Sequence, residues 1–207
     1  MFFMKRKSIV FLATISIFLA TNCAKRYHAI SPETLNYSSN YNVDSIDMSY
    51  RYGVLRERGN NRLAKKEDKR GMRIVAVKIT NNTAENIEFG KNYDFYNGST
   101  RLSLISPELA HSTIKQNTLT YLPYLLLTFL QLNITKDNST SSYPIGLVVG
   151  PGITIGNMLV AGGANRNFQD ELRKYNLTNG IVKPGETKYG IISIDGSSYD
   201  PLVIKKK

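Results

Sequence analysis

Residues 72–80 read MRIVAVKIT, a stretch with the pattern of a β-strand. Val75, Val77 and Ile79 alternate with residues that point the other way, which is the period-two pattern of a β-strand with one apolar face. Two asparagines at 81–82 follow directly, and asparagine tolerates the backbone conformations of turns. The stretch therefore predicts a core strand that ends in a turn.

The sequence on either side predicts more short strands. Residues 46–54 alternate apolar and polar side chains, and residues 61–70 favour a short polar helix that ends at Gly71. Near the far end, Pro184 and Gly185 suit a type II turn, in which proline presets φ and glycine supplies a positive φ. Further strands are expected at residues 86–89, 93–96, 100–105, 187–194 and 202–204. Short strands separated by turn signals favour a β-sandwich.

Two of these motifs carry a resemblance to known folds. The strand and turn at residues 75–83, together with the later Pro184-Gly185-Glu186 turn, look like the immunoglobulin-like sandwiches that are common in exported bacterial proteins. The resemblance implies a mainly β fold, an immunoglobulin-like β-sandwich over residues 43–207, and no particular activity. A hydrophobic insert, either helical or a mixed hairpin, is expected within it at about residues 116–175.

The first 22 residues have the parts of an export signal. A basic start with Lys5, Arg6 and Lys7 precedes an apolar run over residues 9–20 and a small polar exit. As a helix, the run would reach about 18 Å at 1.5 Å per residue, which is short of a hydrocarbon core of about 30 Å. We therefore expect a signal peptide over residues 1–22 rather than a membrane-spanning helix.

The only cysteine, Cys23, stands where the mature chain would begin. This arrangement resembles the signal peptide of bacterial lipoproteins, including the looser motifs of Bacteroidota. Ala20 and Asn22 depart from the usual motif, which has leucine and a small residue at these positions. The resemblance implies that Cys23 carries thioether-linked diacylglycerol and anchors the protein in the bacterial cell envelope, with the outer membrane as the expected location. The alternative is a free cysteine after an ordinary signal peptide. Residues 23–42 are expected to form a tether or an ordered surface arm.

Basic residues outnumber acidic ones in the expected mature chain. Three of the 27 Lys and Arg and none of the 16 Asp and Glu lie in residues 1–22, which leaves 24 against 16 and a net charge of +8. The densest run covers residues 56–73, and it is either a solvated segment or a contact for an anionic surface. No aromatic residues interleave with it, so nucleic-acid binding is not expected. The residues predicted to contact an anionic surface are Arg62, Lys65, Lys66, Lys69 and Arg70.

A long segment between Lys115 and Arg166 is almost free of charge, with only Lys136 and Asp137 charged within it. Its apolar stretches at residues 119–134 and 145–164 flank a polar turn at 135–142, which predicts a hairpin. Pro151 removes a backbone donor, so the second arm is expected to be extended before Pro151 and helical after it, to about Tyr175.

Three alternatives remain open for this hairpin. It can bury its apolar residues as a helical layer on one sheet face, or it can dock partners or further copies of itself. It can also insert into the leaflet that holds the Cys23 lipids, with Tyr121, Tyr124 and Tyr143 at the interface. Glycines at GxxxG spacing, Gly146/Gly150 and Gly152/Gly156, would permit close approach of another backbone. The residues predicted to contact a membrane or a partner are Leu125, Leu126, Phe129, Leu130, Leu147, Val148, Ile153, Ile155, Met158 and Leu159.

Motifs of catalysis are missing from the sequence. Gly150, Gly152 and Gly156 do not match the spacing of a dinucleotide-binding turn, and the sequence has no nucleophile elbow, P-loop or metal-binding pair of cysteines. We therefore expect no enzyme activity, no cofactor and no metal. The predicted function is a structural or interaction component of the envelope. The alternative is a binding protein with a small-molecule or glycan pocket where the glycine-rich turn meets the sandwich.

Overall fold

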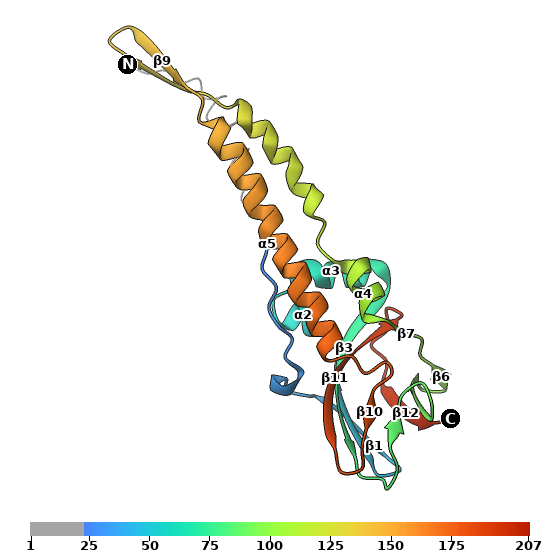
Figure 1. Ribbon diagram of the computed structural model, residues 1–207. Coiled ribbons are helices and arrows are strands. Elements are labelled where there is room, and N and C mark those ends of the chain that lie inside the picture. The colour runs from blue at the N-terminus through green and yellow to red at the C-terminus, as the bar shows by residue number, and fades with distance from the viewer. Residues whose placement is uncertain (1–22) are drawn as a thin grey trace. The chain divides into compact units, whose positions relative to one another are not determined.

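A computed structural model describes residues 23–207 (Figure 1). The predicted signal peptide, residues 1–22, lies outside the described residues. The chain forms two compact units. The described part of the first, which we call the hairpin unit, comprises residues 23–26 and 117–163, and the second, the sheet unit, comprises residues 27–116 and 164–207.

The sheet unit is built from antiparallel strands in three sheets. The largest has the order β1-β2-β3-β11-β7, with β1 (Ser39–Val43), β2 (Ile46–Arg51), β3 (Met72–Asn81), β11 (Thr187–Asp195) and β7 (Leu104–Ile105). A three-stranded sheet has the order β12-β5-β6, with β12 (Leu202–Lys206), β5 (Tyr93–Asn97) and β6 (Thr100–Arg101). The smallest pairs β10 (Ile181–Val182) with β4 (Ile87–Glu88).

Strand β3 is buried on both of its faces, which makes the five-stranded sheet a middle layer. Val75 and Val77 belong to a core that also contains Phe95 and Ile204 of the small sheets. Residues on the other face, such as Ile74, belong to a second core that the helices complete. These helices are α2 (Val54–Glu57), α3 (Asn61–Arg70), α4 (Pro107–Ile114) and the C-terminal part of α5 (Gly146–Lys174).

Several local predictions are confirmed. The stretch at residues 72–80 is strand β3, and the polar helix at 61–70 is α3, which ends at Gly71 with φ of +64°. Gly185 has the positive φ, +73°, that the predicted turn requires. The strand expected over 46–54 stops at Arg51, because Gly53 turns the chain with φ of +68° and α2 begins after it.

The fold as a whole is mixed α/β, which corrects the expectation of a mainly β chain. Antiparallel sheets that share a core are present, as a sandwich requires. Helices, however, cover the other face of the large sheet with a core of their own. The apolar residues that this second core needs come from helical segments around Leu55, Leu63, Ile114 and Phe168. The sequence predicted the helices that carry Leu63 and Phe168, but not α2 and α4, which carry Leu55 and Ile114.

The segment after Cys23 is an ordered arm from Tyr27 onward. Ile30 is fully buried, and the short 3₁₀ helix η1 (Pro32–Thr34) follows it. The carboxylate of Glu171 on α5 accepts hydrogen bonds from the backbone N–H groups of Ile30 and Ser31 at 2.9 and 2.8 Å, and from the Tyr27 hydroxyl. Residues 27–31 are thus held against Glu171 of α5.

The hairpin unit has two helical arms joined by a β-ribbon. The first arm is the 3₁₀ helix η2 (Thr118–Phe129), the ribbon pairs β8 (Leu132–Lys136) with β9 (Ser139–Tyr143), and the second arm is the beginning of α5. The predicted extended half before Pro151 is wrong, because α5 begins at Gly146 and runs through Pro151. Pro151 lies in the second helical turn, where its missing N–H removes a single hydrogen bond, to the carbonyl of Leu147.

Candidate functional sites

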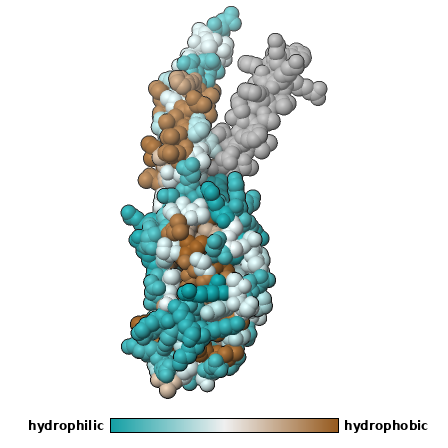
Figure 2. Space-filling model, turned by 90° about the vertical axis from the view of Figure 1, so that its right-hand side faces the viewer, coloured by the Kyte–Doolittle hydropathy of each residue, from teal (hydrophilic) through white to brown (hydrophobic). Residues whose placement is uncertain are grey.

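The apolar residues of the hairpin arms are exposed. Phe129 is 81% exposed, Val148 78% and Leu126 70%, although residues of this kind normally lie in a core. Figure 2 shows hydrophobic side chains gathered on the surface of these arms. Of the ten residues predicted to contact a membrane or partner, Ile153 and Met158 are half-buried and the other eight are exposed. These eight do not form the helical core layer that was one of the three alternatives.

Glycines hold the two arms together. A Cβ atom placed on Gly146 would lie 2.3 Å from the carbonyl oxygen of Leu127, and one placed on Gly150 would lie 2.6 Å from Oγ1 of Thr128. Gly152 has open space around the same position. The GxxxG pair at 146 and 150 therefore serves contact within the hairpin, and the glycine-rich segment belongs to α5 rather than to the pocket that the binding-protein alternative predicted.

Cys23 lies beside the second arm. The backbone N–H of Ala24 donates a hydrogen bond of 2.6 Å to Oδ1 of Asn157, and Nδ2 of Asn157 donates to the carbonyl of Ile153 at 2.8 Å. Cys23 itself is exposed. Between Gly146 and Asn157, α5 rises by about 17 Å at 1.5 Å per residue. Cys23, the residue expected to carry lipid, is thus held beside Asn157, about 17 Å along α5 from its first residue, Gly146.

Two tyrosines of η2 lie at a similar height. The rings of Tyr121 and Tyr124 stack with centroids 6.5 Å apart. Thr128 of η2 contacts Gly150 of α5. Along the hairpin and away from the ribbon, Tyr124 lies about 8 Å and Tyr121 about 14 Å from Thr128, at 2.0 Å per residue. In the same direction, Asn157 lies about 10 Å from Gly150 along α5. Asn157 therefore lies level with the gap between the two tyrosines.

The β8–β9 ribbon is exposed along its whole length, and its residues are polar except for Leu132, Ile134 and the aromatic Tyr143. Asp137 and Asn138 form its turn with φ of +49° and +61°, so the only charged pair of the segment is at the tip. Within residues 23–207, α5 is the one helix whose length and apolar composition would allow it to cross a membrane. That property rests on the half of α5 that belongs to the hairpin unit.

The predicted basic contact lies on α3. Lys65, Lys69 and Arg70 are exposed, whereas Arg62 and Lys66 are half-buried. Burial, together with the nearby positive charges of Arg70 and Lys115, lowers the pKa of Lys66. Exposed cations on one short helix fit contact with an anionic surface and do not by themselves define a partner.

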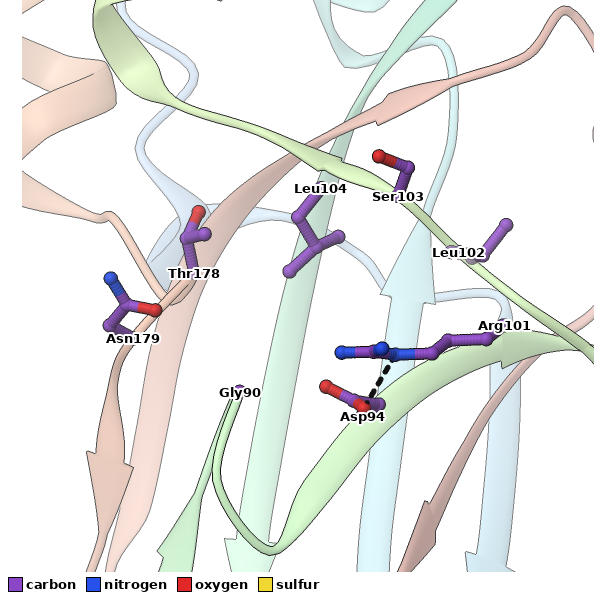
Figure 3. Close-up of a pocket in the computed structure, with 8 residues that line it drawn as sticks. All are labelled: Gly90, Asp94, Arg101, Leu102, Ser103, Leu104, Thr178 and Asn179. Atoms are coloured by element: carbon purple, nitrogen blue, oxygen red, sulfur yellow. Dashed lines mark ion pairs between the residues drawn. The ribbon is translucent and has the colours of Figure 1, made fainter. Parts of the chain in front are cut away.

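A polar pocket opens in the sheet unit, and the sequence did not predict it (Figure 3). It has a volume of about 470 Å³. At its base the carboxylate of Asp94, whose side chain is 9% exposed, lies 2.7 Å from Nε of Arg101 and 3.3 Å from Nζ of Lys207. The lining residues are Gly90, Asp94, Arg101, Leu102, Ser103, Leu104, Thr178 and Asn179.

Other titratable groups serve the fold. Burial raises the pKa of Glu67 to about 7, although its carboxylate accepts a hydrogen bond from the backbone N–H of Ile74 at 2.7 Å. Burial also lowers the pKa of His111 on α4. Residues 23–207 contain no group of three or more His, Cys, Asp or Glu side chains placed to hold a metal ion.

Two features of these sites were missed in the sequence although a local signal exists. Asp94 lies between the buried aromatic residues Tyr93 and Phe95 of β5, where a carboxylate is unusual. Asn157 is a polar interruption in an apolar helix.

Comparisons of the chain with protein families, curated proteins and solved structures find no match. The contacts described above are therefore the basis for a functional assignment.

Proposed function

We propose that the protein is a non-catalytic lipoprotein of the bacterial cell envelope, held in the outer membrane by lipid on Cys23 and by its apolar hairpin. One observation carries this proposal: the hydrogen bond from Ala24 to Asn157 ties the expected lipid site to the exposed apolar arm. Acyl chains on Cys23 would enter the bilayer beside α5. The arm and the lipids then share one membrane.

The distance between the position of Cys23 and the start of α5 is close to the thickness of one leaflet. The rise of about 17 Å from Asn157 to Gly146 is close to half of a hydrocarbon core of about 30 Å. Tyr121 and Tyr124 fall at the headgroup level, where tyrosine is enriched in membrane proteins. Lys25 and Arg26 follow Cys23 by two and three residues and would meet anionic headgroups.

The energy of transfer also supports membrane contact. A large apolar side chain gains on the order of 1.5 to 3 kcal/mol when it leaves water completely. The hairpin exposes many such side chains, and lipid on Cys23 would add about 0.8 kcal/mol for each buried CH₂. Two anchoring signals of this kind give stable attachment where one acyl chain does not.

The ribbon extends the hairpin further and supports self-association. Five residues per strand add about 16 Å, which brings Lys136 and Asp137 to about 33 Å from Asn157, near the opposite headgroups. Unpaired strand edges are costly in hydrocarbon, at several kcal/mol for each unsatisfied group. We therefore assign the ribbon edges to pairing with ribbons of further copies or of an envelope partner.

A second candidate function is binding of a small molecule or glycan, and the pocket around Asp94 and Arg101 favours it. The two functions are compatible, because the pocket belongs to the sheet unit and the apolar arms to the hairpin unit. The immunoglobulin-like character of the sandwich remains a prediction.

Metabolic labelling in a bacterial host tests the anchor. Cells that express the full chain are fed radiolabelled palmitate, and the Cys23→Ser variant is the control. The wild-type chain should take up label, fractionate with the outer membrane and begin at residue 23 by mass spectrometry. Label on the Cys23→Ser chain, or an unmodified thiol at Cys23 in the wild-type chain, would contradict the proposal.

A further inference from the structure

The pocket of the sheet unit has the size of a small-molecule site and a mostly polar lining. Its volume of about 470 Å³ lies within the usual range of small-molecule sites, about 300 to 1,000 Å³. Its residues come from separate segments, namely β5, β6, β7 and the loops that carry Gly90 and Thr178. Long-range packing therefore brings the polar groups together.

Arg101 dominates the chemistry of this pocket. Nε of Arg101 faces the Asp94 carboxylate at 2.7 Å, and the end of the guanidinium group reaches over Asp94 into the space below Leu104 (Figure 3). Lys207 approaches the same carboxylate oxygen at 3.3 Å, so the charge of Asp94 is shared between two cations. The terminal nitrogens of Arg101 form a planar fork, and such a fork matches a carboxylate in two parallel hydrogen bonds.

The remaining lining suits a ligand with hydroxyl groups. Ser103 and Thr178 offer hydroxyls, and Asn179 offers an amide that can donate and accept. Gly90, with φ of +83°, makes room for this amide, since a Cβ at that position would lie 3.3 Å from Oδ1 of Asn179. Leu102 and Leu104 supply the apolar part of the lining.

We propose that this pocket binds a carboxylated sugar, with the carboxylate on the guanidinium of Arg101 and the hydroxyls on Asn179, Thr178 and Ser103. The site is independent of the lipid anchor and of the hairpin. A neutral sugar would leave the Arg101 fork without its partner, so the negative charge of the ligand decides the affinity.

The test is isothermal titration calorimetry on the full chain in detergent micelles, with D-galacturonate as the probe. D-galactose and the methyl ester of D-galacturonate are the neutral comparisons. Galacturonate should bind at millimolar concentration or below, and both neutral compounds should bind about 10- to 100-fold more weakly, as expected for loss of charge-assisted hydrogen bonds. Equal binding of all three, or no binding of galacturonate at millimolar concentration, would overturn the proposal.

Two substitutions separate the fork from charge alone. Arg101→Gln should weaken galacturonate binding about 10- to 100-fold, and Arg101→Lys should restore only part of it because lysine lacks the fork. Arg166→Gln removes an exposed arginine of α5 outside the pocket and should bind like the wild type. Thermal melts check that each variant folds. If Arg101→Gln melts normally and still binds galacturonate like the Arg166→Gln control, the assignment to Arg101 is wrong.

Discussion

Leu126→Asp separates a membrane-contacting hairpin from a buried one. Leu126 is 70% exposed on η2, so the substitution removes little packing in water. Leu109→Asp is the matched control, because Leu109 is 57% exposed on α4 and belongs to the sheet unit. Both variants are made in a Cys23→Ser chain, which removes any contribution from lipid.

The expected effect on membrane binding is large. At the centre of a membrane helix leucine contributes about −0.6 kcal/mol and aspartate about +2.5 to +3.5 kcal/mol to insertion, a difference of about 3 to 4 kcal/mol. That difference corresponds to roughly a 100- to 1,000-fold loss in partitioning. Exposed surface substitutions change stability by only about 0.5 kcal/mol, so neither variant should lose much thermal stability.

Flotation with phospholipid vesicles measures the partitioning, and circular dichroism melts measure the stability. We expect the Leu126→Asp chain to remain at the bottom of the gradient while the Leu109→Asp chain floats like its parent. A large drop in melting temperature for Leu126→Asp alone would place Leu126 in a core. Equal flotation of the two variants would refute hairpin insertion, and loss of an oligomer without loss of flotation would assign Leu126 to a contact between copies.

Three further predictions concern the arms, the core and the basic helix. Gly146→Val should speed hydrogen exchange in the hairpin because its side chain collides with the first arm, whereas Gly152→Val, which meets open space, should not. Because burial raises the pKa of Glu67 from 4.5 to about 7, stability should fall as pH rises through this range, by about 3 kcal/mol in total. Urea titrations at several pH values should show that Glu67→Gln abolishes this fall. The pair Lys65→Glu and Lys69→Glu should weaken flotation with anionic vesicles but not with zwitterionic ones, and added salt should shrink the difference.

The sequence predicted the elements that are determined by residues close to each other in the chain. Strand β3 follows from the alternation of Val75 and Val77, and the end of α3 follows from the need for a positive φ at Gly71. The hairpin was also predictable, since an uncharged segment with one polar break favours two arms. The strand and the helix end depend on neighbours within a few residues, and the hairpin depends on one continuous segment of the chain.

What could not be predicted depends on residues far apart in the chain. Pro151 predicted a break in the second arm, but close packing of Gly146 and Gly150 against η2 supports the helix around it. In the second core, Ile30 of the ordered arm that follows Cys23 lies in one cluster with Phe168 of α5, and no local pattern in the sequence predicts that packing. The pocket has the same origin, because Asp94 and Asn179 line one cavity only after the sheets assemble.

Helix α5 shows most directly why the hairpin needs an environment outside the described chain. Its C-terminal half buries Phe168 and Leu172 and exposes charged residues such as Arg173, as a helix on the surface of a soluble domain does. Its N-terminal half buries only small residues, among them Gly146, Gly150 and Thr154, and exposes Leu147, Val148, Ile155 and Leu159 on the remaining sides.

A helix that is apolar on all sides is stable only in a protein core or in lipid. No element of residues 23–207 covers the exposed sides of this half. A single docking partner would cover one side and leave the others in water, whereas a bilayer covers all of them at once. The distribution of exposed side chains around α5 therefore favours lipid as the main contact of the arm, and it assigns protein contacts to the ribbon, whose strand edges require hydrogen-bond partners that lipid does not provide.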